Sequence, residues 1–148
     1  MEADRPLKIL MLAAECVPFI KTGGLADVAG ALPKSLKALG QDIRVAIPHY
    51  GRIDPLRFGL EQVLPPFPVP MDNQTEKASI LQGRIGEDIP VYMVENPKYY
   101  DRDGIYMYPD DAERFIFFCR SALEMLKRLD WQPDIIHCHD WHTAIVPN

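Results

Sequence analysis

The chain has 148 residues, of which 47% are hydrophobic and 25% charged, a composition typical of a folded globular domain. Its net charge of −5 and its scattered lysines and arginines argue against a nucleic-acid-binding surface and against a polybasic membrane anchor. Its three cysteines are far apart in the sequence, which favours free thiols in a reducing compartment over a disulfide framework. We therefore expect a cytoplasmic protein.

The first third of the chain predicts a strand, a helix and a second strand. Residues 7–14 form an apolar run broken only by Lys8, too short to span a bilayer and typical of a strand buried on both faces. Apolar residues then recur at helical spacing over residues 25–39, before Gly40. The segment "DIRVAIP", residues 42–48, predicts the second strand and completes a βαβ unit.

The middle of the chain is less regular. Residues 55–74 are rich in proline, with four prolines between Pro65 and Pro70, and predict an extended surface loop or flap. Residues 78–85 and 89–95 predict two short strands around a tight turn. Residues 96–109 predict a loop that carries four tyrosines.

The last third predicts a helix, a strand and the start of another helix. Asp110 and Glu113 have the spacing of a capping box before a long apolar helix face. The segment "DIIHCH" predicts a strand, and "DWHTAIVP" predicts the first turns of a helix. The alternation predicts an α/β fold with a Rossmann-like, mostly parallel open sheet. Because such a fold normally continues with further strands, we expect the chain to be a fragment.

The loop "FIKTGGL" is the first candidate site, because it follows the first predicted strand, where open α/β sheets bind ligands. The amides of Gly23 and Gly24 could approach a pyrophosphate at the helix start, and Lys21 could neutralise its charge. The stretch lacks both the G-x-G-x-x-G and the P-loop spacing. A phosphate site and an ordinary turn both remain open on this pattern.

The segment "HCHDWH" is the second candidate site, because it places three histidines and an aspartate at the end of a predicted strand. Zinc binding is one hypothesis. However, Trp141 stands where the metallo-hydrolase pattern H-x-H-x-D-H needs its aspartate, so a substrate-binding turn is favoured. We expect His137 to be a buried structural residue, whereas structural and functional roles stay equally open for His139, Asp140 and His142.

The tyrosine-rich loop is the third candidate, since a tyrosine ring can stack on a sugar while its hydroxyl meets polar groups. The alternative is that the rings pack the loop against the protein. We expect packing to explain most of the four, which are Tyr99, Tyr100, Tyr106 and Tyr108.

Three stretches together resemble one family: "AAECVPFIKTGGLADVAGALPKSL", "YYDRDGIYMYPDDAERFIFFCRSALE" and "PDIIHCHDWHTAIVP". They are similar to the amino-terminal part of bacterial glycogen synthase and plant starch synthase. The resemblance implies that residues 1–148 are an incomplete acceptor-side domain of a two-domain GT-B glycosyltransferase, whose carboxyl-terminal donor-binding domain is absent. It implies retaining transfer of glucose from ADP-glucose to the non-reducing end of an α-1,4-glucan, with no cofactor and no metal.

The resemblance also implies roles for individual residues. It assigns Asp140 to the active site and ADP-glucose binding to Lys21, Gly23, Gly24 and Asp27, and it also implicates Tyr106 in the site. Tyr106, His139 and His142 are candidates for contact with the sugar. We expect residues 1–148 alone to be inactive. The alternatives are a non-catalytic glucan-binding module and, less favoured, a metal-dependent hydrolase built on "HCHDWH". Whether the donor is ADP-glucose or UDP-glucose, and the product glycogen or starch, stays open at this level.

Overall fold

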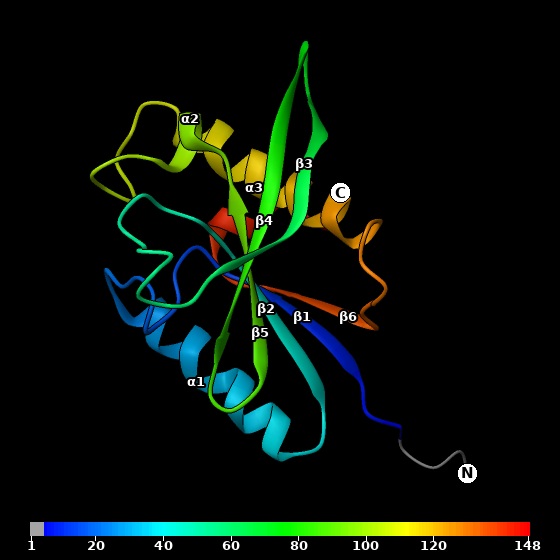
Figure 1. Ribbon diagram of the computed structural model, residues 1–148. Helices are drawn as coiled ribbons and strands as arrows, with labels where there is room; N and C mark the ends of the chain where they lie inside the picture. Colours follow the sequence, from blue (N-terminus) through cyan, green and yellow to red (C-terminus); the bar gives the residue numbers. More distant parts are fainter. Residues whose placement is uncertain (1–4) are drawn as a thin grey trace.

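A computed structural model describes residues 5–148 (Figure 1). Its six strands form one sheet in the order β3-β4-β5-β2-β1-β6. The strands are β1 (Lys8–Leu12), β2 (Asp42–Pro48), β3 (Glu61–Met71), β4 (Gln74–Ile85), β5 (Ile89–Glu95) and β6 (Ile135–Cys138). The helices are α1 (Gly24–Ala38), α2 (Pro97–Tyr100), α3 (Asp111–Leu126) and the single 3₁₀ turn η1 (Trp141–Thr143).

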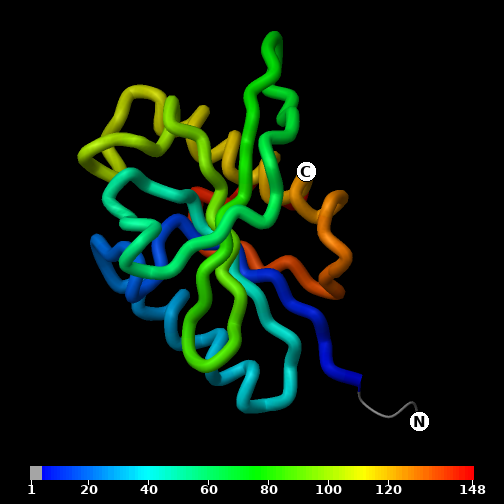
Figure 2. Tube along the Cα trace, in the orientation of Figure 1, coloured from blue at the N-terminus to red at the C-terminus, as the bar shows by residue number. Residues whose placement is uncertain are grey.

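The sheet confirms the predicted α/β class with an open, mostly parallel sheet. Strand β1 pairs in parallel with β2 and β6, and β2 pairs in parallel with β5. The hairpin strands β3 and β4 extend the sheet in antiparallel fashion beyond β5. Helices α1 and α3 lie on either side of the sheet, and the tip of the β3–β4 hairpin projects beyond it (Figures 1 and 2).

Strand β1 lies in the middle of the parallel part of the sheet. Leu10, Met11 and Leu12 have no exposed surface. Because helices cover both faces of such a strand, both sets of alternating side chains are buried, which explains its unbroken apolar sequence. The carboxyl end of β1 leads directly into the glycine-containing loop, so this strand fixes where that loop lies.

The proline-rich segment was predicted as a surface loop, and this prediction is wrong over residues 61–71. These residues form β3, which pairs only with β4 and is an edge strand among the described residues. An edge strand tolerates proline because one side of its backbone donates no hydrogen bonds to a neighbour. The pairing also shifts register between Gln62 and Leu64 and again between Leu64 and Phe67, as bulged edges do.

Two predictions near the carboxyl end also need correction. The helix predicted from "DWHTAIVP" is a 3₁₀ turn followed by hydrogen-bonded turns rather than an α-helix. His137 was expected to be buried, but it is exposed, because β6 pairs only with β1 in the described residues. Within residues 5–148, none of the helices has the length and apolar character needed to cross a membrane.

Gly30 packs α1 closely against the loop that follows β1. A Cβ atom at this position would lie 2.4 Å from Val17 Cγ2 and 2.9 Å from the Val17 carbonyl oxygen. Gly30→Ala should therefore lower the free energy of unfolding by about 1–3 kcal/mol, as overpacking does. Gly24→Ala is the matched control, because its added Cβ meets no atom within 4 Å. Equal thermal midpoints for the two variants would contradict this packing argument.

Candidate functional site

A cleft of about 440 Å³ lies where β1 and β6 end. It collects residues from the glycine loop, the tyrosine loop and the turn after β6, the three regions that the sequence singled out. Its lining residues are Glu15, Thr22, Gly23, Gly24, Leu25, Tyr106, Met107, Asp111, Asp140, Trp141 and His142. Lys21, Asp27 and His139 are predicted site residues that do not line the cleft.

Glu15 connects these segments and was missed by the sequence analysis. Its carboxylate is 1% exposed and accepts hydrogen bonds from the amides of Gly23 (3.1 Å) and Ala26 (3.2 Å). The hydroxyl groups of Thr22 and Tyr106 donate to the same carboxylate, the latter at 2.9 Å. One buried carboxylate therefore holds the glycine loop, the start of α1 and the tyrosine loop together.

These hydrogen bonds determine the charge state of Glu15. Burial by itself raises the pKa of the carboxyl group, because it disfavours the charged form. The four hydrogen bonds outweigh burial and place the pKa below its usual value of 4.5. Glu15 is consequently ionised at neutral pH and puts a fixed negative charge beneath the glycine loop.

The glycine loop is thus only partly free to bind an anion. The amide of Gly23 is already used by Glu15, although the sequence analysis assigned it to a phosphate. A Cβ atom at Gly23 or Gly24 would meet no protein atom within 4 Å, and Gly23 has an extended backbone with φ −158°. Packing does not require glycine at either position, so the open space beside them is available to a ligand.

Lys21 lies at the surface beside this loop. Its ammonium group pairs with the Asp27 carboxylate at 2.7 Å, and the two side chains are 52% and 55% exposed. An exposed ion pair of this kind contributes only about 0–1 kcal/mol. A diphosphate carries more charge than one carboxylate, so Lys21 can exchange Asp27 for a phosphate at little cost.

The turn after β6 holds Asp140 in a strained backbone conformation. Its φ of 65° and ψ of −178° fall in a region that residues other than glycine rarely adopt. The Thr143 hydroxyl donates to the carbonyls of His139 (3.0 Å) and Asp140 (3.2 Å) and braces the turn. The Asp140 carboxylate accepts from the Trp141 amide at 2.7 Å and stays exposed at the cleft.

His139 precedes this turn and His142 lies within it, and burial lowers the pKa of both. Burial is the main cause for both, and the neighbouring His137 lowers the pKa of His139 further. The carboxylate of Asp140 acts in the opposite direction on His142 but does not cancel burial. Nε2 of His139 and Nδ1 of His142 are buried without a hydrogen-bond partner in residues 5–148. Neutral imidazoles can both donate to and accept from hydroxyl groups, as sugar binding requires.

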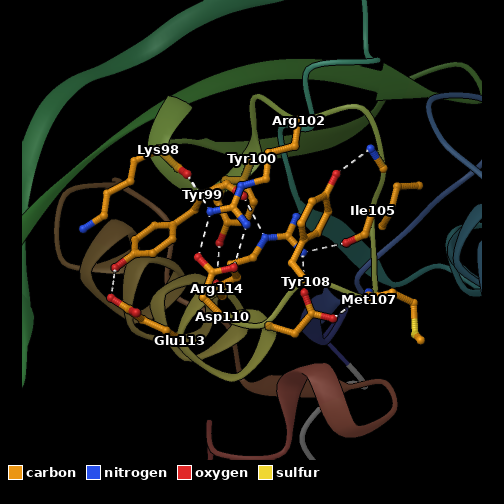
Figure 3. Close-up of polar contacts among 12 residues, drawn as sticks. Lys98, Tyr99, Tyr100, Arg102, Ile105, Met107, Tyr108, Asp110, Glu113 and Arg114 are labelled. Atoms are coloured by element: carbon orange, nitrogen blue, oxygen red, sulfur yellow. Dashed lines mark hydrogen bonds and ion pairs between the residues drawn. The ribbon is translucent and has the colours of Figure 1, made fainter.

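A buried arginine fixes the tyrosine loop (Figure 3). Arg114 on α3 is 0% exposed and donates to the carbonyls of Tyr99 and Ile105, each at 2.7 Å. It also pairs with the Asp111 carboxylate at 2.8 Å. The Asp111 carboxylate in turn accepts from the Met107 amide at 2.8 Å, so both ends of the segment around Tyr106 are anchored to α3.

The start of α3 shows why the predicted capping box is wrong. Asp110 occupies the N-cap position, but its side chain makes no capping hydrogen bond. It instead binds the Arg102 guanidinium through two contacts of 2.6 and 2.7 Å (Figure 3). Glu113 accepts from the Tyr99 hydroxyl at 2.5 Å rather than reaching back to the cap. Two charge-assisted hydrogen bonds to one guanidinium group outweigh a single bond to a backbone amide, so Asp110 serves the tyrosine loop.

Of the four tyrosines, Tyr106 alone lines the cleft. The other three pack against the protein, as was predicted for most of them. Tyr99 and Tyr100 are fully buried, and the Tyr108 hydroxyl accepts from the Gly104 amide at 2.8 Å. The Tyr106 ring stacks on the His142 ring at a centroid distance of 5.0 Å. Tyr106 therefore joins Glu15 on one side of the cleft to the turn after β6 on the other.

The histidine and aspartate side chains of "HCHDWH" do not converge. The rings of His137 and His139 are neighbours on one strand face, with centroids 4.2 Å apart, as the alternation of a strand predicts. Across residues 5–148, however, the side chains gather no group of three or more His, Cys, Asp or Glu residues that could hold a metal ion. The donor set that a structural or catalytic zinc site needs is not assembled.

An open α/β sheet with a cleft at the carboxyl ends of adjacent parallel strands defines a Rossmann-like ligand-binding domain. A family model described as the starch synthase catalytic domain matches residues 8–148, and the chain belongs to this family. The resemblance carried by the three sequence stretches is thereby confirmed.

Individual relatives also carry the names of glycogen and starch synthases. Glycogen synthase from Moorella thermoacetica is 51% identical over 146 residues, which cover 97% of this chain and 29% of the relative. Glycogen synthase from Desulforudis audaxviator is 48% identical, with coverage of 97% and 30%. A solved structure, the catalytic domain of starch synthase IV from Arabidopsis thaliana bound to ADP and acarbose, superposes with a TM-score of 0.86. It is 35% identical, and the match covers 95% of this chain and 29% of that chain. The chain thus spans about 30% of the length of these relatives.

Proposed function

We propose that this chain forms one wall of the active site of a glycogen or starch synthase. The enzyme transfers glucose from ADP-glucose to the non-reducing end of an α-1,4-glucan with retention of configuration. The observation that carries the proposal is the single cleft in which the glycine loop, Tyr106 and Asp140 meet. The relatives named glycogen synthase, and the Arabidopsis structure with ADP and acarbose, support the same reaction.

The residues divide into two groups by chemistry. Lys21 and the backbone amide of Gly24 face the diphosphate, where negative charge grows as ADP departs; an ammonium group there stabilises the transition state more than the ground state. Asp27 holds Lys21 in place until the donor arrives. On the other side, Asp140 orients sugar hydroxyls or offsets positive charge at the reacting ring. We assign no nucleophile.

Apart from Asp140, the groups proposed to contact the sugar are neutral. Burial raises the pKa of Tyr106, and the hydrogen bond to Glu15 raises it further, so the hydroxyl stays protonated. His139 and His142 are uncharged at neutral pH for the reason given above. Uncharged donors and acceptors suit a neutral glucan, because they are not drawn into ion pairs with the departing diphosphate.

The second wall of the cleft belongs to a carboxyl-terminal donor-binding domain that residues 1–148 do not contain. The cleft here is open, and its described lining residues include no lysine or arginine. We also propose a cytoplasmic location, in keeping with the three widely spaced cysteines.

Residues 1–148 alone should incorporate no radiolabelled glucose from ADP-glucose into glycogen, whereas the full-length protein should do so. The reason is that transfer needs both walls to exclude water and to hold the donor. ADP-glucose and UDP-glucose are compared at equal concentration, and ADP-glucose should be preferred. Glycogen binding by the full-length protein without any transfer would favour the glucan-binding module instead. Chain elongation by residues 1–148 alone would contradict the proposal that transfer needs both walls of the active site.

A further inference from the structure

Two further clefts continue from the candidate site along α3. The first, of about 190 Å³, lies beside the turn η1 and has a mainly apolar lining. The second, of about 620 Å³, lies between α3 and the tip of the β3–β4 hairpin. Neither is needed by the reaction proposed above, which takes place beside Asp140.

Shared residues connect the three clefts. Trp141 and His142 line both the candidate site and the first α3 cleft. Ile116 lines both the first and the second α3 cleft. The three clefts are therefore neighbours in a row, and together we name them the α3 groove, which extends from Asp140 along α3 to the hairpin tip. In Figure 1 the same hairpin crosses α3 and projects beyond the sheet.

The lining changes along this path in a way that suits a carbohydrate chain. At the inner end Trp141 is 54% exposed and offers an aromatic face to the apolar side of a sugar ring. At the outer end the lining mixes apolar side chains with polar ones, and the amide groups of Asn73 and Gln74 can pair with hydroxyl groups. Arg120 is the only cation among the outer lining residues, which disfavours a polyanionic ligand.

The outer wall of the groove is held in place. The Arg120 guanidinium donates to the Pro70 carbonyl at 3.0 Å and ties the hairpin to α3. In the turn that follows α3, Arg128 lies over the Phe67 ring at 4.6 Å. The hairpin that carries Asn73 is therefore held both by α3 and by the turn after it. A preformed groove lowers the entropy lost when a flexible chain binds.

We infer that the α3 groove is a binding track for the glucan acceptor, and that it holds sugar units beyond those beside Asp140. This inference rests on the proposed function, because the acceptor end must lie in the candidate site. The track engages only acceptors that are long enough to reach the hairpin. It therefore acts on the affinity for long chains and leaves the chemical step unchanged.

The test uses the full-length enzyme with maltotriose and maltodecaose as acceptors. The double variant Asn73→Ala/Gln74→Ala removes two neutral hydrogen-bonding side chains, so the KM for maltodecaose should rise about 5- to 20-fold. The KM for maltotriose, the KM for ADP-glucose and kcat should each stay within about twofold. Thr75→Ala is the matched control, because Thr75 is an exposed neighbour that does not line the groove.

A second variant tests the path itself. Ile116→Trp fills the junction between the two α3 clefts and should raise the KM for maltodecaose without changing that for maltotriose. If the unmodified enzyme elongates neither acceptor, the proposed function fails. If it elongates both, and the double variant and Ile116→Trp leave both KM values unchanged or raise them equally, the track is wrong and the proposed function stands. Thermal midpoints equal to that of Thr75→Ala verify that the variants are folded.

Discussion

Lys21→Ala in the full-length protein should reduce kcat about 10²- to 10³-fold, the usual cost of removing one group that stabilises developing negative charge. The thermal midpoint should hardly change, because the Lys21–Asp27 pair is exposed and contributes little to folding. Initial rates of glucose transfer from ADP-glucose and a melting curve measure the two effects.

The control for this variant is Lys37→Ala. It removes another exposed lysine, which lies in the last turn of α1, at the opposite end of the helix from Lys21. It should transfer glucose at the unmodified rate. Equal rates for Lys21→Ala and Lys37→Ala would remove Lys21 from the mechanism. Lys21→Arg should recover part of the loss, since it keeps the charge but not its position.

Glu15→Ala should damage both folding and activity. It leaves the amides of Gly23 and Ala26 and the hydroxyls of Thr22 and Tyr106 without their acceptor, so the free energy of unfolding should fall by roughly 2–4 kcal/mol. Transfer should fall at least tenfold, because Tyr106 and the glycine loop lose their common anchor. Thermal melting and kcat/KM report the two losses.

Glu15→Gln separates charge from shape. Its carbonyl oxygen still accepts from the amides, and the hydroxyls of Thr22 and Tyr106 can rotate to accept from its NH₂ group, so its losses should be smaller than those of Glu15→Ala. The folded-state pKa of Glu15 lies below its usual 4.5, so the carboxylate stabilises the fold above that pH and loses this effect as pH falls through the folded pKa. The stability gap between the unmodified protein and Glu15→Gln should therefore shrink as the pH falls below 4.5. Identical losses for the two variants at neutral pH would contradict the anchoring role.

The parallel core of the fold was predictable from sequence because burial on both faces leaves a continuous apolar run. Residues 42–48 were assigned to their strand with the observed bounds, and the hairpin from 78 to 95 was recognised from its alternation and turn. Strand β3 was missed because four prolines normally exclude a strand, and only its edge position makes them acceptable. The family was recognised from the same three segments that border the cleft.

The role of Glu15, which joins the loops of the site, was not predictable in the same way. Glu15 looked like an interruption of an apolar stretch, yet an acidic residue inside such a stretch must find partners when it is buried. That requirement, next to a glycine loop, was the available signal. His137 was misjudged because its exposure depends on which strand lies beside β6. The role of Arg114 could not be predicted, because it donates to backbone carbonyls of a loop that has no sequence periodicity.

The place of β1 in the sheet has a consequence for how the protein is made. Among the six described strands β1 is synthesised first, and it pairs with β2 on one side and with β6, the last of the six to be synthesised, on the other. One edge of this apolar strand therefore stays open until nearly all of the described residues have been synthesised. Pairings between such distant segments form late and slowly, and unpaired strand edges invite aggregation meanwhile. A nascent chain stalled before β6 would be a natural client for chaperones.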